Sequence, residues 1–157
     1  MKIEGKGKYT NTMKNKNLKW VYNCKYIDFN ELSKLYKIAP LGDKKAEDLK
    51  VVFANSLYKC FVYEEEKLIG VGRALADGVD CSYICDVAIH PDYQGKGVGK
   101  NLVSKLVELS YGHNKIILYS YPGKENFYAT LGFAKMNTAM AIFKNQEQAF
   151  GWQLLKR

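Results

Sequence analysis

Residues 92–103 read DYQGKGVGKNLV, and within them Gly95, Gly97 and Gly99 alternate with Lys96 and Val98. Glycine is used where φ must be positive or where a ligand must come close to the backbone. An apolar segment precedes this stretch and an amphipathic one follows it, which predicts a strand, a glycine loop and a helix in that order. Such an arrangement points backbone N–H groups and the positive end of a helix toward an anion. A plain tight turn is the alternative, but it would not need glycines that each weaken a helix start by roughly 1 kcal/mol.

The spacing of the glycines excludes two common nucleotide-binding patterns. The P-loop pattern GxxxxGK[ST] fails because Gln94 stands where its first glycine belongs. The dinucleotide pattern GxGxxG fails because Lys100 or Leu102 occupies the place of its third glycine. The pattern that does fit is Gln-x-x-Gly-x-Gly, at Gln94, Gly97 and Gly99.

The rest of the chain supplies the elements that would position this loop. Periodicity, caps and turn signals predict strands at 18–27, 58–65, 67–78, 81–90 and 115–120, and helices at 29–39, 43–57, 98–112 and 123–133. Asp28 is the expected N-cap of the first helix, with Glu31 completing a capping box. A final hairpin is expected over 133–137 and 139–145, and the tail from Gln146 is ambiguous. The order predicts a single α/β domain on a mixed sheet.

A second motif, NFYATLGF at residues 126–133, lies beyond the glycine loop. With the loop it resembles the GNAT (Gcn5-related N-acetyltransferase) family, whose signatures are [RQ]xxGx[GA] and FYxxLGF. The resemblance covers roughly residues 18–143, and residues 70–103 are similar to a bacterial and plastid subgroup that includes arylalkylamine-type acetyltransferases. It implies a GNAT fold, a central mixed sheet of about six to seven strands flanked by about four helices and splayed between the fourth and fifth strands. The GNAT domain would span 19–157, after a flexible basic arm over 1–18.

The same resemblance implies acetyl-CoA as co-substrate. No metal is expected, because no Cys-x-x-Cys pair or Cys/His cluster has the spacing of a zinc site. The pyrophosphate would lie against the backbone of Gly95, Lys96, Gly97, Val98, Gly99 and Lys100. Gln94 would add a side-chain donor, and Lys96 or Lys100 a screening cation. Backbone N–H groups of Val87, Ala88 and Ile89 would hold the acetyl and pantetheine parts, in the manner of a small oxyanion hole. Phe127 would also contact the coenzyme.

Acetyl transfer from a thioester to an amine needs a neutral amine, a polarised carbonyl and a protonated leaving thiolate. By resemblance, Tyr128 would be the general acid, with its hydroxyl aimed at the coenzyme sulfur. A phenol with a pKa near 10 is protonated at pH 7, and a thiol with a pKa near 8.5 leaves easily. The alternative for Tyr128 is an ordinary core tyrosine.

The sequence leaves open which group takes the proton from the amine, and three interpretations are possible. Asp86 lies in the apolar segment YICDVAI, where an unpaired charge is costly, so it is a candidate base. It could instead pair with Arg73 of the neighbouring strand, or a water relay to backbone carbonyls could take the proton. The chain also resembles glucosamine-6-phosphate acetyltransferases, but Cys85 and Tyr119 replace their acidic residues, which argues against an aminosugar phosphate acceptor.

Composition narrows the class of protein less than the motifs do. The net charge of +8 suits a nucleic-acid binder, a pocket for a polyanionic cofactor or plain solubility, and much of the excess lies in residues 2–19. No nucleic-acid motif, signal peptide or membrane span is recognisable. The four scattered cysteines indicate reduced thiols and a cytoplasmic protein.

The resemblance to the GNAT family, with the residues that carry it, implies an acetyl-CoA-dependent enzyme that transfers acetyl directly to a primary amine of a small molecule or a protein. A non-catalytic acyl-CoA-binding sensor or interaction module on the same fold is the alternative. Neither nucleic acid nor membrane is an expected partner. A homodimer is an open expectation, because family members often dimerise through their last strands.

Overall fold

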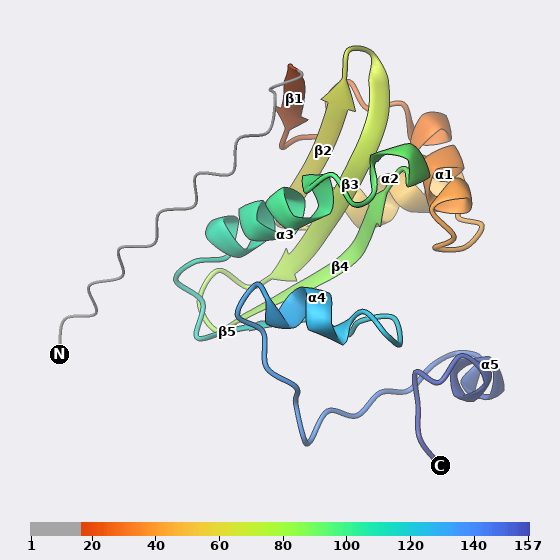
Figure 1. Cartoon of the computed structure of the whole chain (residues 1–157), viewed down its shortest axis with the longest axis vertical. Helices are drawn as coiled ribbons and strands as arrows, with labels where there is room; N and C mark the ends of the chain where they lie inside the picture. Colours follow the sequence, from red (N-terminus) through yellow and green to blue (C-terminus); the bar gives the residue numbers. More distant parts are fainter. Residues whose placement is uncertain (1–16) are drawn as a thin grey trace, which may run out of the picture.

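The computed structural model describes residues 17–157; residues 1–16, where most of the predicted basic arm falls, lie outside the described residues. Figure 1 shows the helices and strands in chain order. Their bounds are β1 Leu18–Val21, α1 Phe29–Ile38, α2 Ala46–Ala54, β2 Tyr58–Glu64, β3 Lys67–Ala76, β4 Cys81–Ile89, the 3-10 turn η1 Pro91–Tyr93, α3 Val98–Leu109, β5 Lys115–Ile117, α4 Glu125–Ala129 and α5 Gln146–Gly151.

The strands form one mixed sheet in the order β1-β2-β3-β4-β5. Neighbours are antiparallel from β1 to β4, and β5 runs parallel to β4. The predicted α/β fold is therefore present, but the described residues hold five strands in place of about six or seven. Two predicted strands are also shorter than expected: β1 ends at Val21 and β5 at Ile117.

The expected hairpin over 133–145 is wrong, because these residues form no strand. Met140 and Ile142 are 97% and 95% exposed. A strand needs a neighbour that satisfies its backbone N–H and C=O groups, and β5, the last strand of the sheet, is only three residues long. The segment leads away from the sheet to α5, which lies in the tail that the sequence left ambiguous (Figure 1).

Asp28 caps α1 as predicted, since its carboxylate accepts hydrogen bonds from the N–H groups of Asn30 and Glu31 at 2.8 and 3.3 Å. The capping box is not completed. Glu31 reaches across the fold and accepts a hydrogen bond from Leu68 N–H at 2.8 Å, so it ties α1 to β3.

Helices cover both faces of the sheet (Figure 1). On one face α1 and α2 pack on the sheet around Leu32, Leu35, Phe53, Phe61 and Ala88. On the other face α3 packs on it around Leu102, Leu106, Val62, Ile69 and Ile84. Burial of these side chains from water is the main term that holds the helices to the sheet.

The longest helix, α3, has 12 residues. Between residues 17 and 157, no helix combines the length and apolar character that would be needed to cross a membrane.

Candidate active site

β4 contains a bulge at Asp86. Val71 pairs with Ala88 and Arg73 with Cys85, so two residues of β4, Asp86 and Val87, lie opposite the single residue Gly72 of β3. Asp86 has φ +53°, in the left-handed region that non-glycine residues rarely adopt. One strand therefore carries an extra residue that bends it, as β-bulges next to active sites commonly do.

Gly72 lies opposite this bulge. A Cβ added to Gly72 would stand 2.7 Å from Leu102 Cδ2 and 2.8 Å from Leu106 Cδ1, closer than side-chain carbons can come. The absence of a side chain at Gly72 thus lets α3 pack directly on the bulged part of the sheet.

β4 and β5 separate just before the bulge. They pair only at Cys81, Ser82 and Tyr83 of β4, opposite Lys115, Ile116 and Ile117 of β5. Within the described residues, β4 from Ile84 onward has no β5 partner, so the predicted splay between the fourth and fifth strands is present. Val87, Ala88 and Ile89 lie on this part of β4, where backbone polar groups at the open edge need another partner.

The glycine loop follows β4 through η1 and leads into α3. Gly95 and Gly97 have φ +71° and +83°, and Gly97 is the N-cap of α3. The first helical hydrogen bond runs from Asn101 N–H to Gly97 O at 3.0 Å. The N–H groups of Val98 and Gly99 precede that bond and have no acceptor within the helix, as at any helix start.

Side chains tie the loop to β4. Gln94 Nε2 donates to Ile89 O at 3.0 Å, so this predicted phosphate donor holds the loop against the end of the strand with one of its two hydrogens. A Cβ on Gly99 would stand 3.3 Å from Ile89 Cγ1 and 3.8 Å from Phe127 Cζ. The small size of Gly99 therefore also allows close packing between α3 and β4, a contact that the sequence interpretation did not include.

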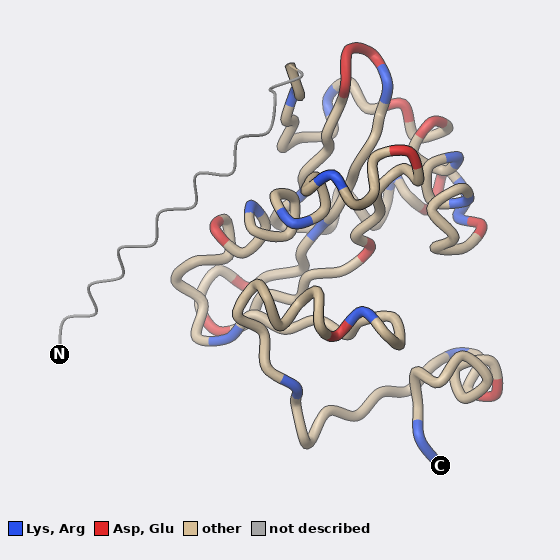
Figure 2. Tube along the Cα trace, in the orientation of Figure 1, with Lys and Arg blue, Asp and Glu red and all other residues tan. Residues whose placement is uncertain are grey.

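The charge around the loop is positive. Lys96 and Lys100 are exposed, and Figure 2 shows basic residues along the loop and the first turns of α3. The Lys96 ammonium stands 5.4 Å from the centre of the Tyr93 ring. Val98 is buried in the core and anchors the helix start, so it contributes only its backbone to the loop.

Tyr128 lies on α4, next to the start of α3. Its ring contacts those of Phe127 and Phe133, with centroid distances of 5.0 and 6.1 Å and nearly perpendicular planes. Phe127 in turn lies against Gly99. Burial raises the pKa of the Tyr128 hydroxyl, which keeps the group protonated. Among the described residues the hydroxyl makes no hydrogen bond, so a donor is available for a ligand.

Asp86 is held by partners from three other segments. Arg73 Nε donates to Asp86 Oδ2 at 2.7 Å, and Lys44 Nζ donates to Oδ1 at 3.2 Å. The Tyr36 hydroxyl donates to the Asp86 carbonyl at 2.8 Å. The Arg73 partner was one of the sequence alternatives. Lys44 was missed, because nothing in a loop lysine's local sequence shows that it folds back onto a strand 42 residues away.

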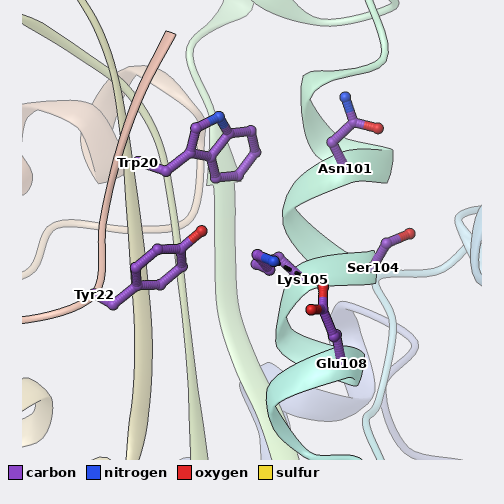
Figure 3. A pocket seen from close by; sticks show the side chains of 6 residues that line it. All are labelled: Trp20, Tyr22, Asn101, Ser104, Lys105 and Glu108. Carbon is purple, nitrogen blue, oxygen red and sulfur yellow. Dashed lines mark hydrogen bonds and ion pairs between the residues drawn. The ribbon is translucent and has the colours of Figure 1, made fainter.

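Two pockets lie outside these contacts. One, of about 310 Å³, opens between β1 and α3, where Trp20 and Tyr22 face Asn101, Ser104, Lys105 and Glu108 (Figure 3). It contains none of the predicted site residues. The other, of about 530 Å³, lies beside α4 and is lined by Tyr119, Ser120, Pro122, Glu125, Gln153, Leu154, Leu155 and Lys156. No cluster of three metal-ligating side chains occurs within residues 17–157.

Comparison with known proteins agrees with this geometry. The family model of the acetyltransferase (GNAT) family matches residues 23–133. The chain belongs to the GNAT family. It is therefore of the N-acetyltransferase class, and members of the GNAT family use acetyl-CoA as co-substrate.

Two curated GNAT relatives show how far the likeness extends. The uncharacterized N-acetyltransferase ycf52 of Gracilaria tenuistipitata var. liui is 34% identical over 83% of this chain and 71% of that protein. The chloroplastic GCN5-related N-acetyltransferase 2 of Arabidopsis thaliana is 43% identical over 72 residues, which are 45% of this chain and 28% of that protein. This chain thus matches only part of each relative.

A solved structure supports the GNAT fold. Protein SA2161 from meticillin-resistant Staphylococcus aureus superimposes with a TM-score of 0.73 at 21% identity, over 82% of this chain and 99% of that one. The residues of this GNAT chain also suit the coenzyme: a glycine-capped helix start for its diphosphate, and an open β4 edge for its extended arm.

Proposed function

We propose that this chain transfers an acetyl group from acetyl-CoA directly to a primary amine of a small molecule or a protein. One juxtaposition carries the proposal. Phe127 packs against Gly99 at the helix start, and the ring of its neighbour Tyr128 contacts the Phe127 ring, which supports a position of the Tyr128 hydroxyl near the bound coenzyme. The thiol leaving group, the diphosphate and the acetyl group of the coenzyme would then lie along this part of the protein.

The coenzyme would be held mainly by backbone groups. Its diphosphate would accept hydrogen bonds from the amides between Gly95 and Lys100, including those of Val98 and Gly99, which lack helical acceptors. The Lys96 and Lys100 ammonium groups add positive charge, since both side chains are exposed at this end of α3. The amides of Val87, Ala88 and Ile89 would polarise the acetyl carbonyl.

Tyr128 would donate a proton to the departing sulfur. The raised pKa of its hydroxyl, caused by burial, favours the protonated phenol that this role requires. For the base, both oxygens of Asp86 are occupied by cationic donors, which supports the water relay as the route by which the amine loses its proton.

The acceptor would approach from the pocket beside α4. Glu125 lines this pocket and lies three residues before Tyr128, so both occupy one face of the helix. The Glu125 carboxylate would attract the ammonium group of the acceptor, while Tyr119 and Leu154 would contact the apolar part of the acceptor. These groups suit an apolar or aromatic amine.

The test is release of free coenzyme A thiol from acetyl-CoA in the presence of arylalkylamines, polyamines and a lysine-containing peptide. We expect one class of amine to accelerate thiol release, and Tyr128→Phe to lower kcat by about 10- to 1000-fold with little change in KM for acetyl-CoA. Tyr58→Phe, a half-buried tyrosine on β2, serves as the control and should behave as wild type. Coenzyme binding without thiol release for any amine would overturn the transfer reaction in favour of a binding module.

A further inference from the structure

The bulge in β4 rests on an unfavourable backbone conformation at one residue. Asp86 has φ +53°, and only glycine adopts this region freely, while Asp and Asn tolerate it better than other side chains. The extra residue also reverses which face of the sheet the following side chains occupy. Ile84 packs with Leu106 under α3, whereas Ala88 packs with Leu35 under α1. The orientation of Val87, Ala88 and Ile89 therefore depends on Asp86.

A buried hydroxyl holds the backbone of Asp86. Tyr36 is fully buried in α1, and its hydroxyl donates to the Asp86 carbonyl at 2.8 Å. Burial, followed by the nearby Asp86 charge, raises the pKa of Tyr36 well above its ordinary value, so this donor keeps its proton. Removal of the hydroxyl alone would leave the bulge carbonyl without that partner.

Two cations hold the Asp86 carboxylate, and each is fixed by further contacts. Arg73 Nη1 donates to Ser56 Oγ at 3.1 Å, and its guanidinium stands 6.0 Å from the centre of the Phe53 ring. Lys44 is anchored at its carbonyl, which accepts a hydrogen bond from Ser33 Oγ at 2.5 Å. The donors to Asp86 thus come from α1, the α1–α2 loop and β3, and Ser56, just after α2, supports one of them by accepting from Arg73.

We propose that Asp86 is a conformational residue of the bulge and not the general base, and that Tyr36, Lys44 and Arg73 are positioning residues for the amides of Val87 to Ile89. These contacts hold Asp86 in the left-handed conformation, at a position where a regular strand would have extended backbone. The bulge would thereby turn the amides of Val87 to Ile89 toward the acyl group. This inference rests on the proposed function for the role of those amides, but the clamp itself is a feature of the protein alone.

Substitutions at Asp86 separate the two roles. Asp86→Asn keeps the tolerance for positive φ and an oxygen acceptor for Arg73, but it cannot accept the proton of an amine. Asp86→Ala loses both properties. If Asp86 is conformational, Asp86→Asn keeps kcat within about threefold of wild type, while Asp86→Ala loses at least roughly tenfold in kcat/KM for acetyl-CoA. Should both variants lose about 100-fold or more in kcat together, Asp86 is the base and the proposal is wrong.

Tyr36→Phe tests the clamp without any change in charge. We expect the dissociation constant for acetyl-CoA to rise by about three- to tenfold, with an unchanged circular dichroism spectrum. The matched control is Tyr63→Phe, a partly buried tyrosine packed against the same core, which should leave the dissociation constant as in wild type. Equal affinity of wild type and Tyr36→Phe would overturn the positioning role of Tyr36.

Isothermal titration with acetyl-CoA needs no turnover, so it distinguishes the two proposals. A wild-type protein that binds acetyl-CoA but acetylates no amine would contradict the proposed function, while the Tyr36→Phe and Asp86→Ala affinities would still decide the clamp. If either variant unfolds, Asp86→Gly provides the second comparison, because glycine adopts positive φ without strain. Weaker acetyl-CoA binding by Asp86→Gly than by Asp86→Ala would contradict the conformational role.

Discussion

Ile84 and Ala88 are four residues apart in β4, yet they pack on opposite faces of the sheet. In a regular strand, residues separated by an even number share a face. The extra residue at Asp86 breaks this rule. Before the bulge, Ser82 and Ile84 point toward α3, and after the bulge Val87 and Ile89 do so. The bulge thus lets β4 contribute side chains to the hydrophobic core along its whole length, although its backbone no longer pairs with β5 after Tyr83.

Gly72, opposite the bulge, is the position where we expect the largest loss of stability from one added methyl group. Leu102 and Leu106 are fully buried, so neither can swing away from a Cβ only 2.7 or 2.8 Å distant. Gly72→Ala should lower the free energy of unfolding by about 1–3 kcal/mol, measured by urea titration. Gly151→Ala is the control: no atom lies within 4 Å of its added Cβ, and the change should stay within about 0.5 kcal/mol. Equal stability of Gly72→Ala and wild type would show that α3 shifts to make room.

The turn between β3 and β4 depends on an ionised Asp77. Its Oδ1 accepts hydrogen bonds from the N–H groups of Val79, Asp80 and Cys81 at 2.9, 2.7 and 3.2 Å, and these bonds lower the pKa of Asp77 below its ordinary value of 3.8. A carboxylate with a lowered folded-state pKa stabilises the fold above its unfolded-state pKa, and this contribution is lost as pH falls through the folded-state value.

Asp77→Ala should therefore reduce the melting temperature at pH 7, and the difference from wild type should shrink progressively below pH 3.8. Thermal unfolding across pH 2 to 8 (approximate limits) measures it. Asp43→Ala serves as the control, since Asp43 is exposed and 4.0 Å from its partner Lys37, and it should change little at any pH. A difference between Asp77→Ala and wild type that persists unchanged at low pH would contradict the role of the charge.

Cys85 should take no part in the transfer. Burial raises the pKa of its thiol to about 11, so at pH 8 only roughly 0.1% of it would be thiolate. We expect Cys85→Ala to keep kcat within about threefold of wild type. Mass spectrometry of the protein after incubation with acetyl-CoA alone provides the second check, and an acetyl group on Cys85 would point to a covalent route.

Local signals in the sequence were enough for the glycine loop, the Asp28 cap and the order of most elements. The helical spacing of apolar residues after the glycine loop predicted a helix from Val98, and Gly97 is indeed the N-cap of α3 with positive φ. Each of these features is decided by residues within one or two turns of each other, which is the range over which caps and turns act.

Features set by distant partners could not be predicted in this way. Glu31 has the spacing of a capping box, yet it bonds to Leu68 N–H, 37 residues away. Lys44 reaches Asp86 from a loop, and the bulge itself follows from a register between β3 and β4 that no local pattern records. The hairpin over 133–145 failed for the same reason, because strand propensity is realised only where a neighbouring strand accepts the pairing.

The raised pKa of Tyr128 leads to a prediction about pH. A general acid must be protonated to act, and burial moves the Tyr128 hydroxyl above its ordinary pKa of 10.0. At saturating amine, kcat should therefore show no descending limb below pH 10, and only the rising limb of the acceptor amine should appear. Initial rates of thiol release measure this profile, with Tyr128→Phe as the comparison at each pH. A descending limb centred below pH 10.0 in wild type and missing in Tyr128→Phe would show that the pKa of this hydroxyl is lowered and not raised, against the burial that its contacts with Phe127 and Phe133 create.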